Sequence, residues 1–285
     1  MSEAINLDNI NCLICDAKAS YFFSKEYASY PGSPFLDGYL VNYFKCNHCG
    51  FVLSKTHVDM SDSEWNQLNS SWHHHFESSV EDRTNNQPPY AEQALALMLL
   101  HENKLIDLNS TLDYAAGYGS MAKVLKKYFR KDIFLFDKYV AGVDSDLIYI
   151  KPNEIGKYKT VINSAMFEHI LKREHLENVN NLVDCDGVLM LHTVVCERVP
   201  KDSNWFYINP MVHTAFHTNK SMSILMEQWG YRASLYSPQA KSWFLFKKES
   251  PMINDLNEVV NKINNELQSK YFYYKQGFFD YWKGF

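Results

Sequence analysis

In the central part of the chain, the order of apolar and polar residues predicts strands that alternate with helices. Short apolar runs such as "STLDYAA", "DIFLFD", "KTVINSA" and "GVLMLHTVV" predict buried strands, and segments with helical spacing, such as "YAEQALALMLLHEN" and "NKSMSILMEQWG", separate them. Two consecutive runs, "YRASLYS" and "SWFLFKK", predict an antiparallel edge. We therefore expect an α/β fold built on a doubly wound, mostly parallel sheet of seven strands.

Two regions of different character flank this pattern. Residues 1–80 contain two cysteine pairs among turns and short strands, and then the polar run "MSDSEWNQLNSSWHHHFESSVEDRTNNQPPY", which is typical of a linker or lid. Residues 251–285 contain a helix with one apolar face and an aromatic tail, which indicates packing or contact with a second copy of the chain. We expect domain limits at 1–80, 81–250 and 251–285.

Composition and charge narrow the classes of protein. The 285 residues are 46% hydrophobic and 21% charged, as in ordinary soluble globular proteins. A net charge of -5 argues against a nucleic-acid-binding surface. The first residues, "MSEAINLDNINC", lack the basic start and apolar stretch of a signal peptide, and no stretch of 18 apolar residues occurs. We expect a cytoplasmic protein that binds neither nucleic acid nor membrane.

The cysteines of the N-terminal region have the spacing of a metal site. Cys12, Cys15, Cys46 and Cys49 form two Cys-x-x-Cys pairs separated by 30 residues. Four thiolates suit a closed tetrahedral Zn²⁺ site without an open coordination position. The pattern therefore predicts a structural zinc ion, the alternative being four reduced cysteines that serve only in packing.

The glycine turn in "STLDYAAGYGSMAKVL" allows two interpretations. Starting from Gly117, it matches the loose dinucleotide pattern Gly-x-Gly-x-x-Ala of an NAD-dependent oxidoreductase. Starting from Asp113, it matches acid-x-small-x-Gly-x-Gly, the pattern of S-adenosylmethionine (SAM) binding. Asp137, at the end of the next strand, suits a ribose in either case. Asp113 favours SAM, because a dinucleotide strand is usually apolar before its turn, and Ala115 and Ala116 fit a ligand without a diphosphate.

Taken in order, these segments resemble class I SAM-dependent methyltransferases. "LDYAAGYGSMAKVL", "FLFDKYV", "VINSAMFEHI" and "GVLMLHTVV" are similar to the successive motifs of that family over about residues 88–248, and "FEHI" is similar to its Glu-His signature. With the cysteine module, the chain resembles the subset that includes sugar methyltransferases. The resemblance implies a Rossmann-like fold, SAM as cofactor and a hydroxyl of a nucleotide-linked or glycan-bound sugar as methyl acceptor. Ala115 departs from the family, which usually has its first glycine there.

The resemblance also implies where the cofactor binds. Residues of the glycine turn would surround the methionine part of SAM, Asp137 would bind its ribose, and residues at the end of the fourth strand would lie near the ligand. The implied set is Asp113, Ala115, Gly117, Gly119, Asp137, Ser164, Ala165 and Met166.

Histidines are the candidate proton acceptors, since an imidazole titrates near neutral pH. His213 follows the fifth strand in "PMVHTAFHTNKSM" and is favoured as the base, with substrate binding as its other role. His192 and His169 are further candidates, with structural roles as the alternative, and Glu168 is a candidate partner of these rings. The run His73 to His75 suits a metal or substrate contact, or three solvated side chains. The aromatic "NWFYINP" suits a sugar ring or the core.

A second hypothesis belongs to a different class of protein. Ala115 in place of a glycine would fit a zinc-containing, Rossmann-like scaffold that has lost catalysis. Asp113, Gly117, Gly119 and Asp137 argue for the enzyme.

Overall fold

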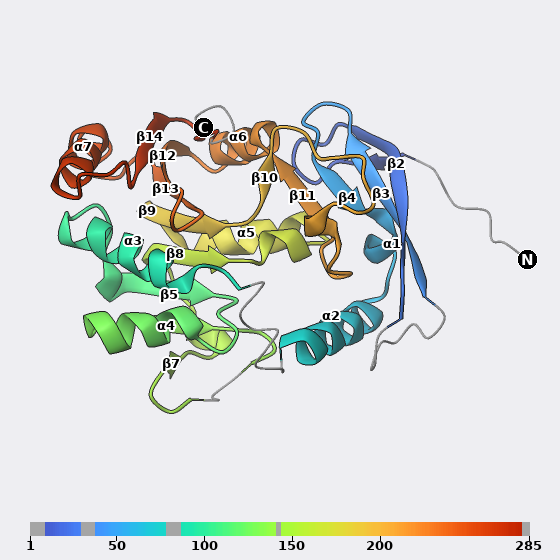
Figure 1. Ribbon diagram of the computed structural model, residues 1–285, viewed down its shortest axis with the longest axis horizontal. Coiled ribbons are helices and arrows are strands. Elements are labelled where there is room, and N and C mark those ends of the chain that lie inside the picture. Colours follow the sequence, from blue (N-terminus) through green and yellow to red (C-terminus); the bar gives the residue numbers. More distant parts are fainter. Residues whose placement is uncertain (1–8, 30–37, 78–86, 141–143, 281–285) are drawn as a thin grey trace, which may run out of the picture. The chain divides into compact units, whose positions relative to one another are not determined.

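The structure, a computed structural model, describes residues 9–29, 38–77, 87–140 and 144–280 (Figure 1). The chain forms two compact units. The first unit comprises Met1–Asn86, Glu168–His175 and Val194–Ile224, and the second comprises Gln87–Phe167, Leu176–Thr193 and Leu225–Phe285. Two segments from the middle of the chain therefore belong with the cysteine-containing region.

A six-stranded sheet forms the first unit. Its strand order is β1 (Ile10–Asn11), β2 (Lys18–Tyr27), β3 (Tyr39–Cys46), β4 (Val52–Ser54), β11 (Ala215–Thr218) and β10 (Val195–Cys196). β2 and β3 pair antiparallel over their full length, and β11 joins the sheet by pairing with β4. The expectation of short strands is wrong for β2, which has ten residues. Its mixture of aromatic and polar residues conceals the strand period of two.

Helix α2 (Asp62–Glu77) replaces the linker or lid expected from the polar composition. It begins with a capping box, in which the Ser61 N–H donates to the Glu64 carboxylate (2.8 Å) and the Glu64 N–H donates to Ser61 Oγ (3.3 Å). Trp65 and Leu68 are buried one turn apart in the core of the first unit. The narrow apolar stripe and the capping box thus stabilise a helix, although the average composition of the segment is polar. Short helix α1 (Lys55–Val58) precedes it. The rest of the expected linker, residues 78–86, lies outside the described residues.

An eight-stranded sheet forms the second unit, in the order β14, β12, β13, β9, β8, β5, β6, β7. Neighbours from β9 to β7 pair in parallel, and β13 pairs antiparallel to β9. The strands span Thr111–Tyr114 (β5), Phe134–Phe136 (β6), Ile148–Tyr149 (β7), Tyr158–Ser164 (β8), Val183–His192 (β9), Tyr231–Ser237 (β12), Ser242–Lys247 (β13) and Tyr273–Gln276 (β14). This is the expected mixed α/β sheet, mostly parallel with an antiparallel hairpin.

The expected number of seven strands is wrong for this sheet. The eighth strand, β14, comes from the aromatic tail and pairs with β12. A run of aromatic residues shows no alternation, so the sequence did not distinguish this strand from general packing. Phe278 and Phe279 of the same tail stack on Trp243 (5.3 Å between ring centroids) and Tyr236 (5.8 Å). Packing therefore explains the tail as far as residue 280.

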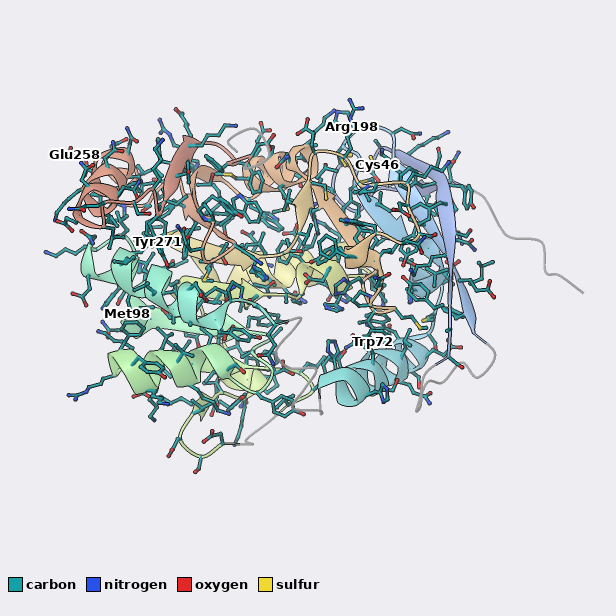
Figure 2. The ribbon with its side chains drawn as sticks, in the orientation of Figure 1. Cys46, Trp72, Met98, Arg198, Glu258 and Tyr271 are labelled. Carbon is teal, nitrogen blue, oxygen red and sulfur yellow. The ribbon has the colours of Figure 1, made fainter. Side chains whose placement is uncertain are left out.

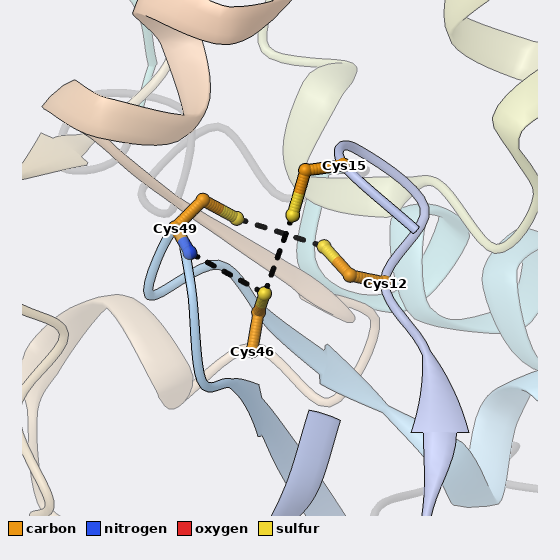
Figure 3. Close-up of side chains that lie close together, drawn as sticks. All are labelled: Cys12, Cys15, Cys46 and Cys49. Carbon is orange, nitrogen blue, oxygen red and sulfur yellow. Dashed lines mark hydrogen bonds between the residues drawn. The ribbon is translucent and has the colours of Figure 1, made fainter. Parts of the chain in front are cut away.

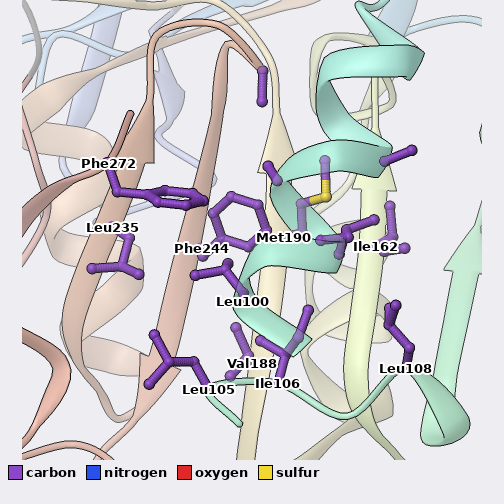
Figure 4. Packing of buried hydrophobic residues seen from close by; sticks show 14 of the residues in the cluster. Leu100, Leu105, Ile106, Leu108, Ile162, Val188, Met190, Leu235, Phe244 and Phe272 are labelled. Carbon is purple, nitrogen blue, oxygen red and sulfur yellow. The ribbon is translucent and has the colours of Figure 1, made fainter. Parts of the chain in front are cut away.

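Helices α3 (Tyr90–Glu102), α4 (Ser120–Val124) and α7 (Leu256–Glu266) contribute to the main core of the second unit. Val188 and Met190 of β9 enter this core, together with Phe244 of β13 (Figure 4). Met98 packs against it (Figure 2). The Tyr271 hydroxyl donates to the Glu92 carbonyl (3.2 Å). The remaining helices, α5 (Arg173–Leu182) and α6 (Asn219–Gln228), each have residues in both units. No helix among the described residues is long and apolar enough to cross a membrane.

Candidate functional site

The parallel part of the second sheet has a switch point between β5 and β8. From β5 the chain passes through β6 and β7 on one side, and then crosses to β8 and β9 on the other side. Ligands of open α/β sheets bind at the carboxyl ends of the strands that flank such a point. Asp113 near the end of β5 and Ser164 at the end of β8 both lie there. The topology thus brings together the two segments that the sequence assigns to the cofactor.

The turn after β5 is built on left-handed backbone. Ala115, Gly117 and Gly119 have φ angles of 64°, 52° and 69°. Glycine adopts this region freely, whereas alanine does so at a cost of about 1 kcal/mol. This cost explains why glycine is usual at the position of Ala115 in the family that the sequence resembles. A Cβ at Gly119 would lie 2.5 Å from Leu147 Cδ1, so a side chain there would displace Leu147 as well as strain the left-handed backbone.

Four backbone N–H groups of this turn donate hydrogen bonds within the protein. Those of Ala115 and Ala116 both donate to the Phe136 carbonyl (2.8 and 3.1 Å). The N–H of Gly117 donates to Asp137 Oδ2 (2.9 Å), and that of Gly119 donates to the Ala116 carbonyl (2.9 Å). A diphosphate site depends on N–H groups directed at the ligand. The turn does not offer these four for that purpose.

Asp113 is a buried acid at the base of the turn. It is 4% exposed, and its carboxyl group accepts no hydrogen bond from the residues that the structure describes. Burial, and then the charge of Asp137, raise the pKa of Asp113 to about 7. A carboxylate in this position is poorly solvated and close to a second negative charge. It therefore favours a cationic ligand group over an anionic one.

Asp137 directly follows β6 and holds the turn. Its Oδ1 accepts hydrogen bonds from the N–H groups of Tyr139 (2.8 Å) and Val140 (3.0 Å), in addition to the bond from Gly117 to Oδ2. A carboxylate has about four acceptor positions, so capacity for a ribose hydroxyl remains. The Tyr149 hydroxyl donates to the Gly117 carbonyl (2.7 Å) and fixes the turn from its other side.

The end of β8 lies at the same edge of the sheet as the end of β5, because the two strands pair in parallel. Ala165 is left-handed (φ 62°), and its N–H donates to the His192 carbonyl (2.9 Å). Ser164 Oγ lies 3.4 Å from Gln93 Oε1, and Asn163 Nδ2 lies 3.2 Å from Met166 Sδ. Asn163 is fully buried, and its Oδ1 has no hydrogen-bond donor among the described residues.

Two site residues were missed in the sequence. Gln93 is fully buried on α3 and connects Ser164 with Ser242 Oγ (3.2 Å from Gln93 Nε2). Asn163 Nδ2 donates to the Tyr114 carbonyl (3.1 Å) and ties β8 to β5. Both residues could have been found from the sequence as an amide within an otherwise apolar helix or strand. A buried amide needs a hydrogen-bond partner, which can be a ligand.

Three of the catalytic candidates come together in the first unit. Glu168, His169 and His213 each offer an atom of metal-binding type, and these atoms lie within 4.8 Å of one another. His169 Nδ1 donates to the Val212 carbonyl (2.9 Å), and His213 Nδ1 donates to the Tyr207 carbonyl (2.6 Å). Because a carbonyl only accepts, each Nδ1 carries the proton and each Nε2 keeps its lone pair.

The pKa values of these rings lie below the ordinary range. Burial lowers the pKa of His213 to about 4. Burial and the neighbouring rings of His213 and His73 lower the pKa of His169 further. Both imidazoles are therefore neutral at pH 7. The His73 ring lies 5.3 Å from that of His169, between centroids. His75 is also on α2, and the side chain of His74 lies outside the described residues.

His192, the fourth candidate, belongs to the second unit. It ends β9 opposite Ser164 of β8. Its Nδ1 donates to the Lys241 carbonyl (2.7 Å), which leaves a lone pair on Nε2, and burial lowers its pKa. His192 thus lies on the same sheet edge as the glycine turn, whereas His213 and His169 belong to the other unit.

The sulfur atoms of the two Cys-x-x-Cys pairs lie close together, as expected (Figure 3). The Sγ atoms are 3.6 Å apart for Cys12 and Cys49 and 3.5 Å apart for Cys15 and Cys46. A tetrahedron of Zn–S bonds of 2.3 Å has edges of about 3.8 Å, whereas a disulfide is about 2.0 Å long. Backbone N–H groups of Ile14 and His48 approach the sulfurs of Cys12 and Cys46 at 3.4 Å. The donor set and its spacing fit a structural zinc ion.

Solved structures similar to this chain include methyltransferases. The plantazolicin methyltransferase BpumL, in complex with a pentazolic desmethylPZN analog and SAH, has 10% identity and a TM-score of 0.42, over 65% of this chain and 94% of that one. An O-methyltransferase family protein from Burkholderia thailandensis has 13% identity and a TM-score of 0.39, over 69% and 63%. Magnesium protoporphyrin IX methyltransferase (ChlM) from Synechocystis PCC 6803, with bound SAH, has 13% identity and a TM-score of 0.35, over 55% and 82%.

No protein-family model matches the chain, and no curated protein matches its sequence. At TM-scores below 0.5, structural likeness does not identify an activity. The chemistry of the chain's own residues has to carry the functional assignment.

Proposed function

We propose that the chain is a SAM-dependent methyltransferase whose acceptor is a hydroxyl group of a sugar or of a similar small polar molecule. The cofactor site is the turn after β5, with Asp113, Ala115, Gly117, Gly119 and Asp137. Ser164 at the end of β8, and Ala165 and Met166 directly after it, are the further residues proposed to contact the cofactor.

The observation that carries the proposal is the combination of two acids with an internally bonded turn. Asp113 and Asp137 are close enough for one charge to raise the pKa of the other group. Two carboxylates repel a diphosphate and attract the ammonium and sulfonium groups of SAM. The N–H groups of Ala115, Ala116 and Gly117 are already bonded to Phe136 and Asp137, so these three are not directed at a diphosphate. These features favour SAM over NAD.

The reaction moves a methyl group without external oxidant or reductant. The acceptor oxygen attacks the methyl carbon in line with the carbon–sulfur bond, which breaks and leaves its electron pair on sulfur. The products are a methyl ether and S-adenosylhomocysteine (SAH), and the hydroxyl proton passes to a base. The protein has to orient the two reactants and accept that proton.

Aromatic side chains beside His213 support a sugar as acceptor. The Tyr207 ring lies 4.6 Å from the His213 ring and 5.6 Å from the Trp205 ring, between centroids. Phe206 is 67% exposed. Flat apolar faces stack on the C–H faces of sugars, and a neighbouring imidazole can bind a hydroxyl. These features suit a ring with both kinds of surface.

His213→Ala tests the proposed base. We expect the variant to bind SAH within about twofold of the natural protein and to lose at least about 100-fold in kcat, as for loss of a general base. The assay follows transfer of a radiolabelled methyl group from SAM to a panel of nucleotide sugars.

Two matched variants complete this test. His192→Ala examines the other imidazole with a bonded Nδ1, and His48→Ala removes an exposed histidine and should leave kcat unchanged. An unchanged kcat in His213→Ala would remove His213 from catalysis, and a loss confined to His192→Ala would assign the proton transfer to His192. Transfer to none of the sugars would contradict the proposed acceptor.

We also propose that Cys12, Cys15, Cys46 and Cys49 bind a structural zinc ion in the first unit. Four sulfurs complete a tetrahedral shell, so this ion has no position for a substrate.

A further inference from the structure

Glu168, His169 and His213, here called the HEH cluster, have features that a proton acceptor alone does not require. One ligand atom from each of two imidazoles and a carboxyl group lies within 4.8 Å of the others, and Glu168 is 3% exposed. Glu168 is buried and the two histidines are half-buried, so all three groups are at least partly withdrawn from water. A single base would need only one of them.

Both histidines have the hydrogen-bonding arrangement that is usual for metal ligands. A ligating histidine donates its other ring N–H to a carbonyl or carboxylate, which fixes the tautomer and the ring orientation. His169 does so to Val212, and His213 does so to Tyr207. In each ring, Nε2 is the atom left to coordinate.

The backbone holds the two halves of the HEH cluster in register. The Thr214 N–H donates to the Glu168 carbonyl (2.7 Å), and Thr214 Oγ1 donates to the Ile170 carbonyl (2.7 Å). The Tyr43 hydroxyl donates to the His213 carbonyl (3.4 Å). Adjacent residues therefore fix both ligand-bearing segments, so little order has to be gained on binding.

We propose that the HEH cluster binds a divalent transition-metal ion of the Zn²⁺ type, separate from the ion at the four cysteines. Two imidazole nitrogens and one carboxylate oxygen form the donor set of zinc sites that keep an open position, and Zn²⁺, Co²⁺ and Fe²⁺ all accept such a set. Bonds of about 2.1 Å place neighbouring ligands of a tetrahedral ion about 3.4 Å apart, so the three ligand atoms, which lie within 4.8 Å of one another, move closer together when the ion binds.

The third cluster of this kind, Asp184, Cys185 and Asp186, does not support a similar proposal. Lys159 Nζ forms ion pairs with Asp184 (3.0 Å) and Asp186 (2.6 Å), and Cys185 is exposed. Lys159 therefore already compensates the negative charge of this cluster.

The ion would also refine the proposed function, and this consequence, unlike the binding itself, rests on that function. A hydroxyl at the open position of a divalent ion loses its proton more easily, as water does on Zn²⁺. His213 would then act as a ligand, and His192 would be the remaining imidazole with a lone pair on Nε2. Metal uptake is measured without SAM or acceptor, so failure of either proposal is distinguishable from failure of the other.

Titration with Co²⁺ tests the proposal on the zinc-replete full-length protein after dialysis against a weak chelator. We expect uptake of one Co²⁺ per chain, with visible d–d absorption and without the intense thiolate-to-metal bands of a cysteine site. Glu168→Gln and His213→Ala should each weaken this binding by at least about 100-fold, more than is usual for loss of a residue that only orients a ligand.

His192→Ala is the matched control, because His192 has the same bonded Nδ1 but belongs to the other unit. It should bind Co²⁺ like the natural protein. Circular dichroism and the zinc content verify that each variant is folded, and Glu168→Gln changes the shape least if His213→Ala is unstable. No Co²⁺ uptake by the natural protein, or uptake that folded Glu168→Gln and His213→Ala retain at full affinity, would overturn the proposal.

Discussion

Asp113→Asn is expected to stabilise the protein at pH 8 and to weaken binding of the proposed cofactor. The folded state raises the pKa of Asp113 from an ordinary value of 3.8 to about 7. The fold favours the protonated form, so the free energy of unfolding falls as the pH rises from about 4 to 7. At pH values above 7 the total decrease is about 4 kcal/mol. Asparagine cannot ionise and avoids this loss. The gain of the variant in urea unfolding should therefore be larger at pH 8 than at pH 5.

The same substitution removes the negative charge proposed to face the cofactor. We expect SAH affinity to fall by about 100-fold, since loss of one partner of a buried charged contact costs about 3 kcal/mol. Asp132→Asn, at an exposed acid of the same unit, should change stability by less than about 0.5 kcal/mol and leave binding unchanged. A variant that is destabilised equally at both pH values, or that binds SAH normally, would contradict the assignment of Asp113.

Cys46→Ser is expected to remove the proposed structural zinc ion and to unfold the first unit. Two hydrogen bonds connect the second cysteine pair with the rest of this unit. Thr218 Oγ1 donates to the Cys49 carbonyl, and Lys220 Nζ donates to the His48 carbonyl. Loss of a structural zinc site costs several kcal/mol, and about 4 °C per kcal/mol gives a decrease in Tm of about 15 °C or more. Thermal unfolding and zinc content by atomic emission measure both effects.

Cys185→Ser provides the control for that experiment. Cys185 is exposed on β9 of the second unit, so its loss should change neither zinc content nor Tm. A Cys46→Ser protein that retains its zinc and its Tm would show that the four cysteines only pack against one another.

The sequence predicted the second unit well where one physical signal dominated. Apolar runs such as Val188–Leu191 are buried strands, and the acid at Asp113 marked the end of β5. The left-handed backbone at Gly117 and Gly119 follows from glycine's lack of a Cβ. Local chemistry was sufficient for these features.

Other features depend on contacts between distant segments. β11 joins the cysteine-containing sheet through β4, a pairing that no local pattern announces. Helix α2 was hidden because its average polarity is high, although Ser61 and Glu64 form a recognisable capping box. The HEH cluster could be named as separate candidates, but only the fold joins His169 with His213, 44 residues further along the chain.

The same limit applies to the interpretation of single residues. Gln93 looks like one polar position on a helix, but it is buried and bonded to Ser164, one of the residues proposed for the cofactor site, and to Ser242. The bonded N–H groups around Ala116 and Gly117 support the proposed choice between the two ligands that the glycine pattern left open. Hydrogen-bond direction is a property of the folded backbone and cannot be read from residue types.

Calorimetric titration of the zinc-replete protein with SAH, with NADH as the control ligand and Asp137→Ala as the control variant, tests the central claim most directly. We predict saturable binding of SAH alone, and weaker binding in Asp137→Ala, because that carboxylate both holds Gly117 and is proposed to bind the ribose. Binding of NADH instead of SAH would establish a dinucleotide site, and binding of neither would support a scaffold without catalysis; both results would contradict a SAM-dependent methyltransferase.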